Sequence, residues 1–270
     1  DGALWEGSLI IAADGARIST SVYGNEDFAT RSDVVTISSY LSGFTQAYQS
    51  EFDDSRSGDP IGISVVQKSH SKDTAPDDDY TILTYEVTNT SGAALSDVRI
   101  GLLMDWDVGD ALNNLGGYDD DRDLIYTYDA TSPAQNDKYY GTVVLQGQRA
   151  GRSVGDISYG DTDLLSLLNV SGDPPTAPAD MRSIQVLDAG SIPDGGRVQV
   201  AFAVLGGTDL TDLQDNADAA RAAFNLPTIA AADSLALVAL YNGAGGSGWN
   251  TTWDFKTPVN TWFGVTVTDD

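Results

Sequence analysis

The feature that most limits how this chain can fold is an alternation of apolar and polar residues with a period of two. Within residues 81–87, the apolar side chains Leu83, Tyr85 and Val87 fall on one face of an extended backbone. Residues 98–104 and 197–205 repeat the pattern. Because successive side chains of a strand point to opposite faces, this alternation predicts half-buried strands of antiparallel type.

Further strand candidates lie along most of the chain, and turn signals separate them. The candidates are residues 8–12, 34–38, 62–67, 139–145 and 184–187. Turns are expected at residues 89–92, 116–117 and 194–196, which are rich in Asn, Asp and Gly. Many short strands joined by polar turns predict a mainly β fold, an antiparallel two-sheet β-sandwich.

One segment has a helical period instead. In residues 208–224, Leu210, Leu213, Ala217 and others form a single stripe, and Thr208 is the expected N-cap. We expect this C-terminal helix to pack on the sandwich. The sandwich module is assigned to residues 1–227. Residues 228–270 form a linker and a tail with a short helix at 233–242, too short to hold a core of its own.

The composition limits the partners that this chain can bind. The formal net charge is −26, from 40 acidic and 14 basic residues. Such a surface is poorly suited to nucleic acid or anionic membranes, since phosphate binding requires Lys and Arg. No apolar run is long enough to span a bilayer. The general acidity fits either a salty habitat or solubility through charge, and the sequence leaves both readings open.

A cluster of acids follows the predicted strand at residues 98–104. On a strand, Asp105 and Asp107 point to the same side, opposite Met104 and Trp106, and Trp106 is the expected core anchor. The next residues can fold back over them and supply the oxygen ligands that calcium prefers. The predicted calcium ligands are Asp105, Asp107, Asp110, Asn113, Asp119, Asp121 and Asp123. The alternative is a solvated acidic loop whose side chains cap local turns.

The sequence offers little for catalysis. His70 is the only histidine, and we expect it at the surface, where a strand enters a polar loop. The chain has no cysteine and no G-x-S-x-G nucleophile turn. These observations weigh against a hydrolase with a catalytic triad and against zinc chemistry. We therefore expect a protein that is not an enzyme.

Several longer phrases resemble a module of large secreted bacterial proteins. The carrying phrases are ALWEGSLIIA, DDDYTILTYEVTNTSG, VRIGLLMDWDVGD, GGYDDDRDLIYTYD and RVQVAFAVLGGTDLTDLQDNADAARAAF, within residues 3–225. Similar modules accompany subtilisin-like proteases and proteins exported with C-terminal sorting domains. The resemblance implies an extracellular accessory domain of β-type, and no established activity.

Residues 233–267 resemble the N-terminal cap of bacterial leucine-rich repeat domains, which ends in a W-x-G-V phrase. Here that phrase is Trp262, Phe263, Gly264 and Val265, and no leucine-rich repeat follows. A cap without repeats leaves its apolar face uncovered. Either the chain is a fragment of a longer protein, or this tail packs on the first domain or on a neighbouring copy. The expected interaction surface is formed by Trp249, Trp253, Trp262 and Phe263.

Together these observations predict a secreted or cell-surface structural module, stabilised by calcium, whose partners are other domains of a larger protein or further copies of itself. A carbohydrate-binding or adhesive module is the alternative, with glycans as partners. Its stacking surface would come from aromatic residues such as Trp5, Tyr118, Tyr126, Tyr128, Tyr139 and Tyr140. Cross-strand aromatic pairing is the simpler explanation of those residues. An accessory domain of a secreted protease is a third possibility.

Overall fold

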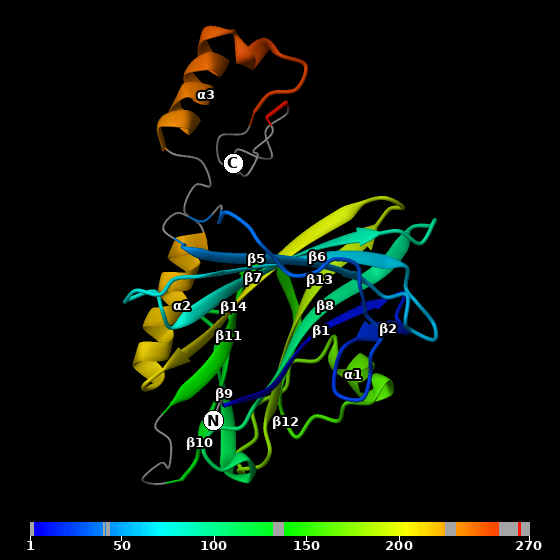
Figure 1. Ribbon diagram of the computed structural model, residues 1–270, viewed down its shortest axis with the longest axis vertical. Helices are drawn as coiled ribbons and strands as arrows, with labels where there is room; N and C mark the ends of the chain where they lie inside the picture. The colour runs from blue at the N-terminus through cyan, green and yellow to red at the C-terminus, as the bar shows by residue number, and fades with distance from the viewer. Residues whose placement is uncertain are drawn as a thin grey trace.

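The structure, a computed structural model, describes residues 3–39, 41, 44–131, 138–224, 231–253 and 264–265. Two antiparallel sheets pack face to face, as Figure 1 shows. The predicted mainly β sandwich is confirmed. Among the described residues, no helix combines the length and the apolar character needed to cross a membrane.

The smaller sheet has five strands in the order β12-β13-β8-β1-β2. Its strands are β1 (Leu4–Ala13), β2 (Arg17–Thr20), β8 (Leu95–Trp106), β12 (Gln148–Gly155) and β13 (Arg182–Ile192). Strand β8 lies at the centre, where Leu102 pairs with Leu9 of β1 and with Gln185 of β13. This central position brings the end of β8 beside the beginning of β13.

The larger sheet has nine strands, eight of them in the order β3-β5-β6-β7-β14-β11-β10-β9, while β4 pairs with β5. Its strands are β3 (Ala29–Thr30), β4 (Val35–Thr36), β5 (Gln46–Asp53), β6 (Ile63–Ser71), β7 (Tyr80–Asn89), β9 (Asn114–Asp119), β10 (Leu124–Asp129), β11 (Tyr139–Gln146) and β14 (Arg197–Gly207).

The main core lies between the two sheets and follows the predicted alternation. From β8 it receives Val98, Ile100, Leu102, Met104 and Trp106. Strand β14 contributes Val200 and Phe202, and Phe202 is fully buried. The prediction that Trp106 anchors the core is confirmed, since its ring stacks on Tyr140 with 5.1 Å between the ring centroids. Burial of these side chains is the main stabilising contribution to the sandwich.

Two helices cover the outer faces of the sheets, on opposite sides of the sandwich (Figure 1). Helix α2 (Leu210–Phe224) packs Leu213, Ala217 and Ala220 on the nine-stranded sheet, as predicted. Helix α1 (Asp161–Leu167) packs Leu164 on the five-stranded sheet and was not predicted. Its length, under two full turns, is too short for a clear helical period.

The start of α2 differs from the prediction by one residue. The side chain of Asp209, not Thr208, accepts a hydrogen bond from the backbone N–H of Asp212, at 2.9 Å. Asp212 in turn accepts hydrogen bonds from the backbone and hydroxyl of Thr208. Asp209 is therefore the N-cap, and Asp212 ties the preceding residue to the first turn of the helix.

The strands that were not predicted are β2, β3, β5, β9, β10 and β12, and β9 with β10 forms a hairpin where a loop was expected. Gly116 and Gly117 lie inside β9 rather than in a turn. A Cβ atom at Gly117 would lie 2.4 Å from the Tyr126 ring, so a larger residue has no room there. The two glycines thus serve close packing within a strand.

The surface position predicted for His70 is wrong. His70 lies on β6 and is fully buried, and its Nδ1 is 2.9 Å from the Ser39 hydroxyl. It pairs in register with Ile82 and Ala47, both buried. Leu41 and Phe44 belong to the apolar cluster around Ile82. The sequence around Leu41 and Phe44 has neither a strand period nor a helical period. It therefore gave no sign that these residues would join the cluster.

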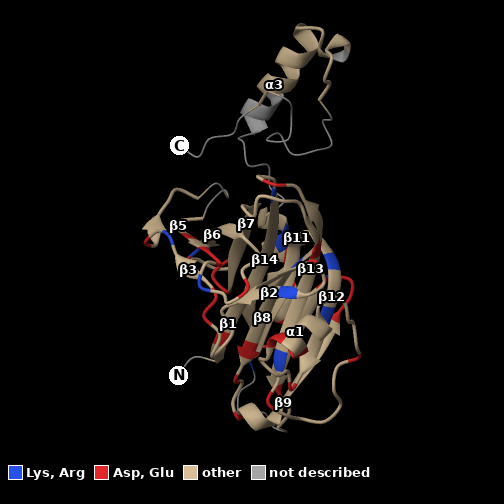
Figure 2. Ribbon diagram, turned by 90° about the vertical axis from the view of Figure 1, so that its right-hand side faces the viewer, with Lys and Arg blue, Asp and Glu red and all other residues tan. Residues whose placement is uncertain are grey.

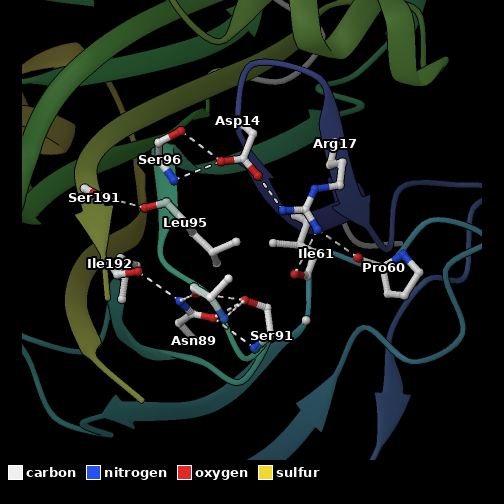
Figure 3. Close-up of polar contacts among 12 residues, drawn as sticks. Asp14, Arg17, Pro60, Ile61, Asn89, Ser91, Leu95, Ser96, Ser191 and Ile192 are labelled. Carbon is white, nitrogen blue, oxygen red and sulfur yellow. Dashed lines mark hydrogen bonds and ion pairs between the residues drawn. The ribbon is translucent and has the colours of Figure 1, made fainter. Parts of the chain in front are cut away.

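Side-chain hydrogen bonds tie the loops together at one end of the sandwich (Figure 3). Asp14 accepts hydrogen bonds from Arg17 and from the backbone and hydroxyl of Ser96. These contacts lower the pKa of Asp14 to about 2. Asn89 donates to the carbonyl oxygens of Ala93 and Ile192, at 2.7 and 2.8 Å. The network joins β1, β7, β8 and β13.

A buried carboxylate holds the connection between β5 and β6. Asp54 accepts hydrogen bonds from the Ser19 hydroxyl at 3.0 Å and from the backbone N–H groups of Ile61, Gly62 and Ile63 at 2.6, 3.1 and 3.0 Å. Four donors satisfy a charge that would otherwise be costly to bury.

The tail contains α3 (Ala231–Gly243) and a short 3-10 turn, η2 (Gly246–Gly248). Helix α3 agrees with the helix predicted at residues 233–242. Tyr241 is buried against Trp249 and Trp253, with 5.2 Å between ring centroids in each pair. Trp262 and Phe263 lie outside the described residues. The boundary at residue 227 stays a prediction.

Candidate functional site

The candidate site lies at the end of β8, on the outer face of the five-stranded sheet. Asp105 is the last acid of the strand and is 2% exposed. Its neighbour Trp106 points into the sandwich, so Asp105 points the other way, as strand parity predicts. Figure 2 shows acidic segments in red near the labels of β8 and β9.

Arg182, the first residue of β13, lies directly opposite Asp105 and contacts three acids. Its Nε is 3.2 Å from Asp105 Oδ2, and its two terminal nitrogens lie 2.9 Å from Asp156 and 2.6 Å from Asp180. The hydroxyl of Tyr159 donates to the same Oδ2 and accepts a hydrogen bond from Arg182 Nε. Although burial acts against its charge, the bond to Tyr159 and the nearby acids raise the pKa of Arg182.

Three carboxylates converge here. Asp105, Asp107 and Asp180 each place one oxygen within 4.8 Å of the other two. A calcium ion binds oxygen at roughly 2.3–2.6 Å, so two ligands on opposite sides of one ion are about 5 Å apart. A single ion can therefore contact all three residues.

The electrostatics of the cluster favour an added cation. Burial raises the pKa of Asp107, and the negative charges of Asp105 and Asp180 raise it further, while Arg182 offsets part of the effect. Three ionised carboxylates face a single guanidinium, so the cluster keeps an excess of negative charge. The Asp107 carboxylate has no hydrogen-bond partner within the described part of the chain.

Asp105 supplies a second, independent observation. Its Oδ1 is buried and has no hydrogen-bond partner, whereas its Oδ2 is bonded to Tyr159 and Arg182. A buried carboxylate oxygen without a partner is costly, and native structures usually provide one. A cation that Asp105 bound through Oδ1 would satisfy this atom.

The other predicted ligands do not join this cluster. Asp110 is exposed and caps the 3-10 turn η1 (Ala111–Asn113) by accepting from Leu112 N at 3.1 Å. Asn113 donates to Asp129. Asp119, Asp121 and Asp123 lie at or beside the β9–β10 turn, at the other end of β9. The predicted seven-residue set is therefore divided among three places: the end of β8, the turn η1 and the β9–β10 turn.

Arginine side chains pair with three acids of the hairpin, Asp119, Asp120 and Asp123. Asp119 pairs with Arg122 at 2.9 Å and Asp123 with Arg149 at 2.5 Å. Although burial acts in the opposite direction, the hydrogen bonds from Arg122 and Gln214 lower the pKa of Asp119. These acids already have protein cations as partners, unlike Asp107.

Sequence reasoning missed Asp180, Arg182 and Tyr159. Asp180 stands just before a strand that was predicted, so antiparallel pairing of that strand with β8 would have placed it near Asp105. The order of strands in the sheet was not accessible from the sequence. Tyr159 lies in a loop before α1 and carries no sequence signal.

Comparison with known proteins does not assign the chain to a family. Neither a protein-family model nor a curated protein matches the chain. Among solved structures the chain resembles a polysaccharide lyase, with a TM-score of 0.39 and 11% identity over 78% of this chain and 27% of the lyase. The chain thus spans little more than a quarter of that enzyme, and a likeness of this size carries no functional argument.

Proposed function

We propose that this chain is a non-catalytic β-sandwich module of a secreted bacterial protein, in which calcium holds the end of β8 against the start of β13. The observation that carries the proposal is the unpartnered, buried Oδ1 of Asp105 beside the carboxylates of Asp107 and Asp180. The module would act as a structural part of a larger surface protein or assembly.

The choice of calcium follows from the donor set. The three acids offer only oxygen atoms, and calcium accepts carboxylates in a flexible shell completed by water. Secretion is supported by the resemblance of residues 3–225 to modules of large secreted bacterial proteins. The sulfur and imidazole ligands typical of zinc are missing from this cluster, in a chain without cysteine.

Thermal unfolding with EDTA and with increasing calcium tests the proposal. Calcium bound to the folded state alone should raise the melting temperature, with a gain of about 2.7 kcal/mol when calcium is at one hundred times its dissociation constant. Asp107→Asn should abolish this gain. Asp121→Asn, the same change on the exposed hairpin turn, should keep it.

Two outcomes would count against the proposal. One is a wild-type melting temperature that calcium does not change. The other is an equal gain in the Asp107→Asn variant, which would place the ion elsewhere. An equal response to magnesium would show a divalent-cation site without the proposed preference for calcium.

A carbohydrate-binding role is the second candidate, and a group of tyrosines favours it. The rings of Tyr128 and Tyr139 stack across β10 and β11 with 4.9 Å between centroids, and Tyr126 lies 6.1 Å from Tyr139. All three are half-buried on the outer face of the nine-stranded sheet. Flat aromatic groups of this kind can stack on the apolar face of a sugar ring. The same three tyrosines also form ordinary cross-strand aromatic pairs.

A further inference from the structure

Arg182 places a permanent positive charge among the acids of the candidate site. Its Nε lies 3.2 Å from Oδ2 of Asp105, and its terminal nitrogens lie 2.6 Å from Oδ2 of Asp180 and 2.9 Å from Oδ1 of Asp156. Only 14% of the Arg182 side chain is exposed. A guanidinium is not deprotonated in proteins, so this charge is present whether or not a metal ion is bound.

The contacts of Arg182 leave carboxylate oxygens for a second cation. With both Asp105 and Asp180, which are proposed calcium ligands, the guanidinium contacts Oδ2. The Oδ1 atom of Asp105 is buried and has no hydrogen-bond partner. Because a carboxylate offers about four lone-pair positions on its two oxygens, an ion can bind through Oδ1 while the guanidinium stays on Oδ2.

The guanidinium is also held by contacts that do not involve the acids. The Tyr159 hydroxyl accepts a hydrogen bond from Arg182 Nε at 2.9 Å, and Arg182 Cζ lies 4.8 Å from the centroid of the Tyr159 ring. The backbone of Arg182 pairs with Asp105 of β8 on one side and with Gly155 of β12 on the other. We therefore expect Arg182 to keep its place when an ion binds.

We propose that Arg182 is a resident cation of the calcium site, which holds the acids together without calcium and lowers the affinity of the site for calcium. This inference rests on the calcium site proposed above and names the residue that regulates it. Carboxylates that lie close together repel one another unless a cation is among them, and two cations on the same carboxylates also repel each other. The same side chain therefore stabilises the calcium-free site and opposes calcium binding.

The consequence is a site of low affinity. Calcium sites range from dissociation constants of about 10⁻⁹ M in cytosolic buffers to about 10⁻³ M in extracellular modules, and ligand charge is one of the properties that set the value. Here three converging carboxylates share their charge with a guanidinium. The site is therefore filled in millimolar calcium and calcium-free in micromolar calcium.

Two measurements on the full chain test this inference: calcium titration by calorimetry, and denaturant unfolding in EDTA. Wild type should bind calcium with a dissociation constant of about 10⁻⁴ to 10⁻³ M. Arg182→Gln should bind about tenfold more tightly, because one positive charge close to the ion is removed. The same variant should be less stable than wild type in EDTA. A residue that only supported the fold would lower stability and affinity together.

Matched variants separate the charge of Arg182 from other effects. Arg182→Lys keeps a positive charge at the site and should bind calcium like wild type. Arg197→Gln removes an exposed arginine that pairs with Glu86 at 3.0 Å at the start of β14, and it should also bind like wild type. Asp107→Asn measures the background of calcium binding by other surface acids.

Failure of Arg182→Gln to fold in EDTA also gives a decisive result. If Arg182 acts through its charge, saturating calcium should restore the folded state of this variant, which circular dichroism measures. A variant that stays unfolded in saturating calcium has lost packing and not only a charge, and this result overturns the inference.

Three further results overturn the inference while the calcium site itself stands. They are a wild-type dissociation constant below about 10⁻⁶ M, an Arg182→Gln affinity equal to or below that of wild type, and an Arg182→Lys affinity as high as that of Arg182→Gln. A wild type that binds no more calcium than Asp107→Asn is a different result, because it removes the proposed site and this inference with it.

Discussion

Asp107 differs from Asp105 and Asp180 in having no ion-pair partner among the described residues. Asp105 and Asp180 both contact Arg182, whereas burial and the charges of those two acids raise the pKa of Asp107, with only part of the effect offset by Arg182. A carboxyl whose pKa is raised by folding destabilises the folded protein when it is ionised. The ionised Asp107 carboxylate, a proposed calcium ligand, therefore lowers the stability of the folded protein when calcium is removed.

In EDTA, Asp107→Asn should therefore be more stable than wild type at neutral pH, the opposite of its effect with calcium. The advantage should disappear below about pH 3.8, the ordinary pKa of Asp, because the carboxyl is then protonated in both the folded and unfolded states. Denaturant unfolding in EDTA at both pH values measures the difference. A variant less stable than wild type at neutral pH in EDTA would contradict the argument.

At this scale the sequence revealed two of the three converging acids and none of their partners. Parity along one strand placed Asp105 and Asp107 on one side, and the buried neighbours Met104 and Trp106 bear this out. Asp180 and Arg182 come from a strand distant in sequence, so only the pairing of β13 with β8 brings them near. Periodicity describes which way a side chain points and not which strand lies beside it.

Among the elements, the β9–β10 hairpin shows why an acidic segment was mistaken for a loop. Its aspartates and paired glycines are typical turn residues. In the structure Arg149 and Arg152 of β12 pair with Asp123 and Asp120 of the hairpin. Val154 and Tyr126 occupy the space that side chains at Gly116 and Gly117 would take. Strands with clear alternation, such as β8 and β14, were predicted. Strands whose pattern depends on such distant partners were not.

The tyrosine group on β10 and β11 carries a prediction at this scale. If Tyr126, Tyr128 and Tyr139 bind a polysaccharide, the wild-type protein should migrate more slowly in a native gel that contains this polysaccharide. The Tyr128→Ala variant should lose most of this retardation. The stability cost should be no more than about 1 kcal/mol, the value of a cross-strand pair.

Tyr23→Ala is the matched control, since Tyr23 is exposed but lies beside Tyr159, away from these strands. Retention of binding by Tyr128→Ala, or no retardation of wild type by any polysaccharide, would remove support for a carbohydrate role.

Over the whole molecule, repulsion among surface acids opposes folding. The net charge of −26 brings like charges together when the chain becomes compact. Ion pairs such as Arg122 with Asp218 relieve this locally, but the 14 basic residues cannot match 40 acids.

Raising sodium chloride from about 0.1 M to about 1 M should therefore raise the melting temperature in EDTA, because the screening length falls from about 10 Å to about 3 Å. The Asp107→Asn variant should show nearly the same increase, since one charge is a small part of the total. A melting temperature that falls with salt would mean that ion pairs outweigh repulsion.

The buried carboxylate of Asp54 has a practical consequence for engineering. One side chain holds the backbone N–H groups of Ile61, Gly62 and Ile63. The pairing register of β5 and β6 therefore does not depend on the tip of the loop between them. The tip at residues 57–59 can then change length without disturbing the strands. A peptide tag or fluorophore inserted there would face solvent and leave the two strands undisturbed.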